Sequence, residues 1–218
     1  MDPRTPDALL RWYGLYPALV QDLLDPQQLG RIQVSFPGFG STGSEVRCWA
    51  TLLSPYADDN QGLQILPEVG SQVVVGFEAG DPARGYIVGA CWNGRAALPE
   101  APETANNLRL LRTRAGSELR FDDTTGAPVV TLSTQAGHQL KLDEASSEVE
   151  LKHSNGCVIR IDAAGKVTVE AHSTVDVSAS QINLKAPMVK CDGVLKCETL
   201  IAQAVVSASY TPGAGNVW

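Results

Sequence analysis

The chain has 218 residues, of which 19% are charged and 6% aromatic, and its formal net charge at pH 7 is −7. This acidic balance argues against a general binder of nucleic acids or anionic membranes, because both attract positive surfaces. The sequence contains no apolar run as long as a bilayer span and no secretory leader, so neither a membrane helix nor export by a signal peptide is expected. Five cysteines at irregular spacing indicate reduced thiols in a protein made in the cytoplasm.

Residues 1–25 are expected to form an N-terminal arm with short helical turns. Residues 7–24 are the only stretch with some helical character, and Gly14 and Pro17 interrupt it. We therefore predict one or two turns of helix there rather than a continuous helix.

Residues 26–95 consist of short apolar runs separated by turn sequences. Four runs are strand candidates: 30–36, 45–53, 71–77 and 85–92. Glycine-containing turns lie between them, and the intervals leave no room for crossover helices. This pattern predicts a small antiparallel barrel or sandwich.

Residues 96–107, rich in Pro, Ala and Glu, break the pattern and are predicted to be a linker or neck. After them, three segments share the pattern Gly-x-x-apolar-basic-apolar-Asp at a period of roughly 20 residues. In each segment the glycine permits positive φ at one corner, and the aspartate caps a turn at the other. These structural turn residues are Gly116, Asp122, Gly137, Asp143, Gly156 and Asp162.

Each repeat predicts two short strands that share one apolar face. A single repeat cannot bury this face, so successive repeats of the chain must stack on one another. A coil that encloses its own core needs about three corners per turn, and this period supplies two. We therefore expect three identical chains to close their apolar faces around a shared axis. The predicted shaft core comprises Leu119, Phe121, Leu140, Leu142, Ile159, Ile161, Val167, Val169, Val175 and Val177.

The alternation of apolar or small with other residues runs from Cys157 to Ala179, far longer than the usual strand of about 5–6 residues. From Gln181 the phase shifts, which predicts a bulge or corner. We expect the shaft to span residues 108–207 and residues 208–218 to form a C-terminal tip segment.

Residues 20–205 resemble the baseplate assembly protein V family of tailed phages, and they are similar to the middle and C-terminal parts of the valine-glycine repeat spike of type VI secretion. The stretch LPEVGSQVVVGFEAGDP carries the resemblance most specifically, and the Gly/Asp repeat follows it. The resemblance implies an all-β chain. Residues 26–95 would form an OB-type (oligosaccharide/oligonucleotide-binding) antiparallel barrel, followed by an intertwined trimeric triple-stranded β-helix, or β-prism.

The resemblance also implies a non-enzymatic, structural central spike that caps the inner tube of a contractile tail and pierces the target envelope. It implies a homotrimer that docks on a separate baseplate hub protein at its N-terminal end. A His-x-His pair that would hold a tip metal is missing near the C-terminus, so a conical capping protein is expected there. The spike is further expected to be synthesised in the cytoplasm and assembled into a phage tail or injection-system particle. Its contact with the target membrane is expected to be transient.

Several other motifs favour structural roles over chemistry. The GxGxxG match at 38–43 is followed by a strand candidate, whereas a dinucleotide site needs a helix there, so no cofactor is expected. The carboxylate pairs at 58–59 and 122–123 lie in turn contexts, which favours capping over catalysis.

No metal site is expected either. His138, His153 and His172 lie far apart in the sequence, and Cys191 and Cys197 lack the usual zinc spacing, so that buried apolar thiols are the better interpretation of the cysteines. The aromatic residues Trp49, Tyr56 and Trp92 are interpreted as core or interface residues.

Two alternatives remain open at this point. A single-chain β-solenoid could bind or cleave polysaccharide, and would be monomeric in solution. An OB-type nucleic-acid-binding protein would need a basic groove with stacking aromatics, and the net charge of −7 argues against it.

Overall fold

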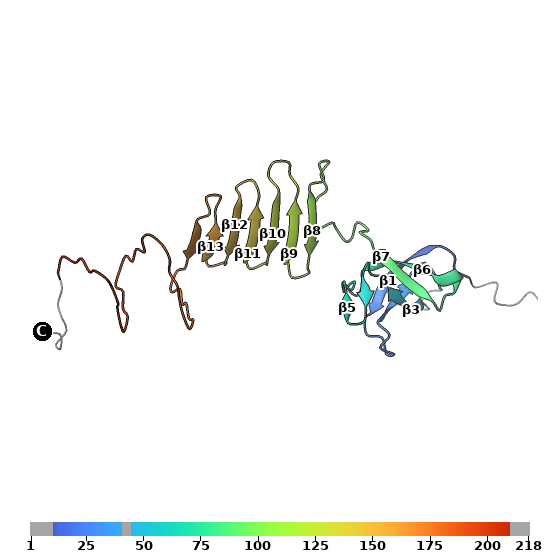
Figure 1. The fold of residues 1–218 in the computed structure, drawn as a ribbon. Helices are drawn as coiled ribbons and strands as arrows, with labels where there is room; N and C mark the ends of the chain where they lie inside the picture. Colours follow the sequence, from blue (N-terminus) through green and yellow to red (C-terminus); the bar gives the residue numbers. More distant parts are fainter. Residues whose placement is uncertain (1–10, 41–44, 210–218) are drawn as a thin grey trace, which may run out of the picture.

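The computed structural model describes residues 11–40 and 45–209, which form a barrel followed by a separate sheet (Figure 1). The barrel is closed and has five strands, the second sheet has seven strands, and β4 (Ala57–Asp58) and β5 (Gln61–Gly62) form a small hairpin. Within the described residues the one helical element is a 3-10 turn, η2 (Glu78–Gly80), and none is long and apolar enough to cross a bilayer. The expectation of an all-β chain is confirmed.

The barrel strands run in the order β1-β2-β3-β7-β6, with β6 returning to pair with β1. All neighbours are antiparallel except β3 and β7, which pair in parallel. This closed five-stranded arrangement is OB-like. The strands are β1 (Leu15–Asp22), β2 (Arg31–Phe36), β3 (Val46–Leu52), β6 (Gln72–Phe77) and β7 (Gly85–Ala90).

The barrel encloses the one extensive hydrophobic core of the described residues. Alternate side chains of β2 point inward, and Ile32, Val34 and Phe36 are at most 2% exposed. Fully buried side chains from the other four strands complete the core: Ala18, Val20, Ala50, Val73, Val75 and Ile87. A closed barrel has no free strand edge, so these five strands pair with one another all the way round.

The expected helical turns at the N-terminus are wrong for the described part of that segment. Leu15–Asp22 forms β1, and Ala18 and Val20 face the core while Pro17 lies opposite Val74 on β6. Because residues 15–20 are all apolar, the period of two that marks a strand was hidden in the sequence. The barrel therefore begins at residue 15 instead of residue 26, and residues 1–10 lie outside the described part.

The second sheet is a meander in which each strand pairs antiparallel with the strand before it. Its turns alternate between two long edges, as Figure 1 shows. The seven strands are short and of nearly equal length: β8 (Leu108–Arg112), β9 (Glu118–Asp122), β10 (Val129–Ser133), β11 (Gln139–Asp143), β12 (Glu148–Lys152), β13 (Val158–Ile161) and β14 (Val167–Glu170).

Residues 171–209 continue beyond β14 without an assigned strand, and all of them are exposed. In Figure 1 they form an extended, repeatedly bent chain. Val175 and Val177, which belong to the predicted shaft core, are 58% and 68% exposed there. The continuation of the shaft to residue 207 stays a prediction, and most of the expected tip segment, residues 210–218, lies outside the described part.

Candidate functional site

Two rows of side chains cross one face of the seven-stranded sheet, because the registers of all six strand pairs agree. The first row is apolar on every strand: Leu111, Leu119, Leu132, Leu140, Leu151, Ile159 and Val169. The second row begins with Arg109 and is apolar thereafter: Phe121, Val130, Leu142, Val149, Ile161 and Val167. We call these two rows the apolar face.

The apolar face is uncovered in a single chain. Phe121 is 42% exposed, Leu132 53% and Ile159 46%, whereas the barrel core is at most 2% exposed. A contiguous exposed apolar surface of this kind marks an interaction site. Eight of the ten predicted core residues lie here, and their burial stays a prediction: Leu119, Phe121, Leu140, Leu142, Ile159, Ile161, Val167 and Val169.

Sequence reasoning missed the part of the apolar face that comes from the intervening strands. Between the repeats, the apolar face is continued by two residues of β10, Val130 and Leu132, and by two residues of β12, Val149 and Leu151. Their period of two is visible in the sequence, so the signal was present but was not assigned to the core.

The opposite face of the sheet is lined by ion pairs. Arg112 Nε donates to Glu118 Oε2 at 2.6 Å, Lys141 Nζ donates to Asp143 Oδ2 at 2.7 Å, and Arg160 Nη2 donates to Glu150 Oε2 at 2.6 Å. Such half-exposed pairs contribute modestly to stability, typically about 0–1 kcal/mol each. These pairs satisfy the charges of a face that suits contact with water, whereas the apolar face of the sheet is left uncovered.

The turns at one edge are capped by the aspartates of the repeat. Asp122 accepts a bond from the Thr124 backbone N–H at 3.0 Å, and Asp143 accepts one from Ser146 at 3.1 Å. Asp162 accepts two, from Ala164 and Lys166, at 2.9 and 3.0 Å. At the other edge the repeat glycines Gly116, Gly137 and Gly156 have φ of 79°, 89° and 95°.

Two of these carboxyl groups have lowered pKa values. The hydrogen bond from the Lys141 ammonium is the main cause that lowers the pKa of Asp143 to about 2, and the Ser146 N–H adds to it. The hydroxyl and backbone N–H of Thr124 lower the pKa of Asp122. Both groups therefore act as ionised turn caps, and their charge is satisfied locally.

The three histidines lie along the edge that carries the repeat glycines. The rings of His138 and His153 contact each other with centroids 4.3 Å apart, and the Nδ1 of His138 accepts the Ser154 backbone N–H at 3.4 Å. A Cβ added to Gly156 would lie 3.1 Å from the Nε2 of His172. Within the described residues no group of three or more His, Cys, Asp or Glu side chains is arranged to hold a metal ion.

The neck is fastened to both the barrel and the sheet. On the barrel side, the Asn93 amide donates to Gln72 Oε1 at 2.7 Å, and its oxygen accepts the Ala96 N–H at 3.0 Å. On the sheet side, Glu100 pairs with Arg112 at 2.6 Å and with Arg120 at 3.1 Å. Residues 96–107 are therefore a held neck rather than a free linker.

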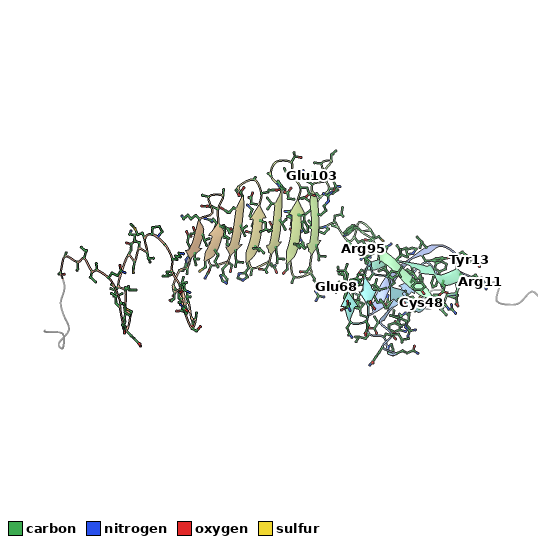
Figure 2. The ribbon with its side chains drawn as sticks, in the orientation of Figure 1. Arg11, Tyr13, Cys48, Glu68, Arg95 and Glu103 are labelled. Atoms are coloured by element: carbon green, nitrogen blue, oxygen red, sulfur yellow. The ribbon has the colours of Figure 1, made fainter. Side chains whose placement is uncertain are left out.

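An aromatic cluster closes one end of the barrel. The Trp12 ring stacks on Phe39 with centroids 4.9 Å apart and makes edge contacts with Phe36 and Phe77. Its backbone N–H donates to Gly80 O at 2.8 Å, and Figure 2 shows Arg11 and Tyr13 at the same end. Sequence analysis missed this cluster, because Trp12 lies in the segment for which helix was expected.

The remaining candidate motifs show no catalytic arrangement. Residues 38–40 of the GxGxxG match form a turn after β2, and β3 rather than a helix follows the match, of which 41–43 lie outside the described part. Asp58 accepts the N–H of Asp59 in the β4–β5 hairpin, as a turn residue does.

The cysteines and aromatic residues only partly match the expectations. Burial raises the pKa of Cys48 to about 11, which makes it an inert thiol. Cys191 and Cys197 are exposed in a single chain, so their predicted burial would need a partner. Tyr56 and Trp92 are 54% and 62% exposed and are not core residues, which leaves an interface role as the prediction.

The barrel matches a known family. Residues 16–92 match the Type VI secretion system/phage-baseplate injector OB domain. This segment corresponds to the closed barrel from the start of β1 to the end of β7, so the barrel is of the injector OB type.

The chain is also similar to VgrG proteins, among them spike proteins of type VI secretion systems. The type VI secretion system spike protein VgrG3 of Vibrio cholerae is 28% identical, over 55% of this chain and 12% of its own length. The spike protein VgrG1a of Pseudomonas aeruginosa is 26% identical, over 58% and 21%. The actin cross-linking toxin VgrG1 of V. cholerae is 24% identical, over 68% and 14%. The chain thus spans a small part of these relatives, and the similarity supports a structural component of a baseplate or spike.

Proposed function

We propose that this chain is the structural central spike of a contractile tail or injection-system baseplate, and that it acts as a homotrimer. Three copies turn their apolar faces toward a common axis, and the ion-paired faces remain in water. The observation that carries this proposal is the pair of apolar rows, which are continuous from β9 to β14 and are left exposed by a single chain. The injector-type barrel and the spike-protein relatives support it.

In this proposal the barrels form a collar that docks on a baseplate hub protein, and the sheets and the following segment 171–207 form the shaft. A separate conical protein caps the C-terminal tip. When the sheath contracts, the shaft pierces the envelope, and contact with the membrane is transient. The spike is made in the cytoplasm and assembled into the particle. Its action is mechanical rather than enzymatic, since hydrogen-bonded strands around a shared apolar core transmit axial force without a weak layer.

Light scattering on the purified protein tests the trimer. We expect three times the chain mass of 23.2 kDa. Leu132→Glu places a carboxylate on the apolar face and should abolish or strongly weaken the trimer, because a buried unpaired charge is costly.

The matched control is Thr131→Glu, the neighbouring position on the ion-paired face, which should leave the trimer intact. A folded, soluble monomer for the unaltered protein would overturn the proposal and would favour a single-chain solenoid. Equal behaviour of the two variants would show that the apolar face is not the interface.

A further inference from the structure

The two turn edges of the seven-stranded sheet differ in charge. The turns 122–128, 143–148 and 162–166 carry six carboxylates and one lysine, and we call them the acidic edge. The turns 113–117, 134–138 and 153–157 carry one arginine, two histidines and no carboxylate, and we call them the histidine edge. Because strands of an antiparallel meander alternate in direction, every turn of one kind lies on the same side of the sheet (Figure 1).

The histidine edge presents hydrogen-bond donors. His138 Nδ1 accepts the Ser154 N–H at 3.4 Å, and His153 Nδ1 accepts the Asn155 N–H at 3.2 Å. A neutral imidazole that accepts at Nδ1 carries its proton on Nε2, so each ring has one remaining N–H to donate. The two rings meet between the turns 134–138 and 153–157.

The acidic edge presents a carboxylate at the matching position. Glu144 lies in the turn between β11 and β12, is exposed, and has no side-chain partner among the described residues. Its neighbour Asp143 is already engaged by Lys141 and Ser146. Glu144 is therefore the free acceptor of this turn.

Threefold closure fixes which edges meet. A rotation about an axis along the stacking direction is a head-to-tail operation, so the acidic edge of one copy faces the histidine edge of the next. The strands run across the long direction of the sheet (Figure 1), and a pure rotation leaves each residue at its own height. The turn between β11 and β12 then lies level with the gap between the turns 134–138 and 153–157, because turns on the two edges are offset by one strand.

We propose that the acidic edge of each copy docks on the histidine edge of the next copy, with Glu144 facing the His138–His153 pair. The inference rests on the homotrimer of the proposed function. It adds the contact between the edges of neighbouring sheets in that trimer. An N–H donor facing a carboxylate gives a charge-assisted hydrogen bond, which is stronger than a neutral one. Because the histidine edge carries no carboxylate, this pairing also avoids placing one acidic edge against another, where like charges would repel.

Cysteine cross-linking tests the contact in a background in which Cys91, Cys157, Cys191 and Cys197 are changed to serine. The inert Cys48 is then the one native thiol that remains. Glu144→Cys combined with His153→Cys, treated with a short bismaleimide, should give covalent dimers and trimers on a denaturing gel. Each single variant should stay monomeric on the same gel. The control pair Glu144→Cys with Asp123→Cys places both thiols on the acidic edge and should also give no ladder between copies.

The outcomes separate this inference from the trimer itself. A trimer by light scattering without the cross-linked ladder overturns the edge contact and leaves the trimer standing. A monomer by light scattering overturns both. If the variant with His153→Cys fails to assemble, Glu144→Cys with His138→Cys probes the same contact from the other ring, and its ladder or lack of one decides in the same way.

Discussion

At the scale of the residue, the turn glycines of the repeat do more than permit a bend. Gly156 has φ of 95°, and a Cβ there would lie 3.1 Å from the His172 Nε2. Gly126, in a turn on the acidic edge, has φ of 79° with no atom within 4 Å of such a Cβ. The two positions share the backbone requirement but differ in the space around them.

Gly156→Ala should therefore destabilise the protein more than Gly126→Ala. Both variants lose about 1–2 kcal/mol, the cost of holding an L-residue in the left-handed region. Gly156→Ala must in addition displace the His172 ring. Thermal unfolding of the two variants beside the unaltered protein measures the difference, and an equal loss in melting temperature would contradict the steric part of the argument.

The pair Lys141–Asp143 predicts a definite response to acid. The pKa of Asp143 is lowered to about 2, so its stabilising contribution is complete above the ordinary carboxyl pKa of about 4 and is lost as the pH falls toward 2. Asp143→Asn should lower the melting temperature at pH 6 and should reduce the further loss between pH 4.5 and pH 2.

The matched control for this titration is Asp192→Asn. Lys190 and Asp192 have the same spacing and lie 2.8 Å apart, but their side chains are 73% and 76% exposed, whereas Asp143 is 15% exposed. Water screens the exposed pair, so this variant should follow the acid profile of the unaltered protein. Identical profiles for both variants would show that the Lys141–Asp143 pair contributes nothing.

At the scale of the element, the neck is the segment that joins the barrel to the seven-stranded sheet. Glu100 pairs with Arg112 and Arg120, and Arg112 also donates to the Pro99 carbonyl at 2.6 Å. The hydrogen bond that Arg112 donates to Glu100 is the largest cause of the raised pKa of Arg112. Figure 2 labels Arg95 and Glu103 toward the two ends of this neck.

Glu100→Gln should loosen the neck while leaving both sheets folded. Loss of an exposed ion pair costs up to about 1 kcal/mol, which corresponds to local opening up to about fivefold more frequent. The rate of trypsin cleavage after the exposed Arg95 measures this opening, with Glu103→Gln, an exposed carboxylate of the same neck, as the control. Equal cleavage rates for the two variants would show that the Glu100 pairs do not hold the neck.

The elements also show what sequence patterns reveal. The repeat predicted strands and turns of the meander well, because residues such as Asp122 and Asp162 combine a period of two with an unambiguous turn signal. β1 was missed because apolar residues fill consecutive positions around Pro17, so that no period is visible. The neck contacts could not be predicted, since Glu100 and Arg120 meet only after the sheet has formed.

At the scale of the whole molecule, the sequence predicted an OB-type barrel followed by a β-rich region, and the structure has this order. Closure of the second region into an intertwined trimeric β-helix stays a prediction. It did not reveal that the barrel is closed at one end by Trp12, because that contact joins residues distant in the chain. The partners of the apolar face are likewise not encoded in a local pattern. A period of two shows which side of a strand is apolar, but it does not show what covers that side.

The uniform register of the meander has a consequence for how the length of such a sheet can vary. Since each pair of strands returns the chain to the same edge with the same residues on the same face, a whole pair can be inserted or deleted without disturbing either end. Neighbouring strands are about 4.8 Å apart, so reach would change in steps of roughly 10 Å per repeat. Duplication or loss of one strand pair would thus lengthen or shorten the sheet and leave the barrel unchanged.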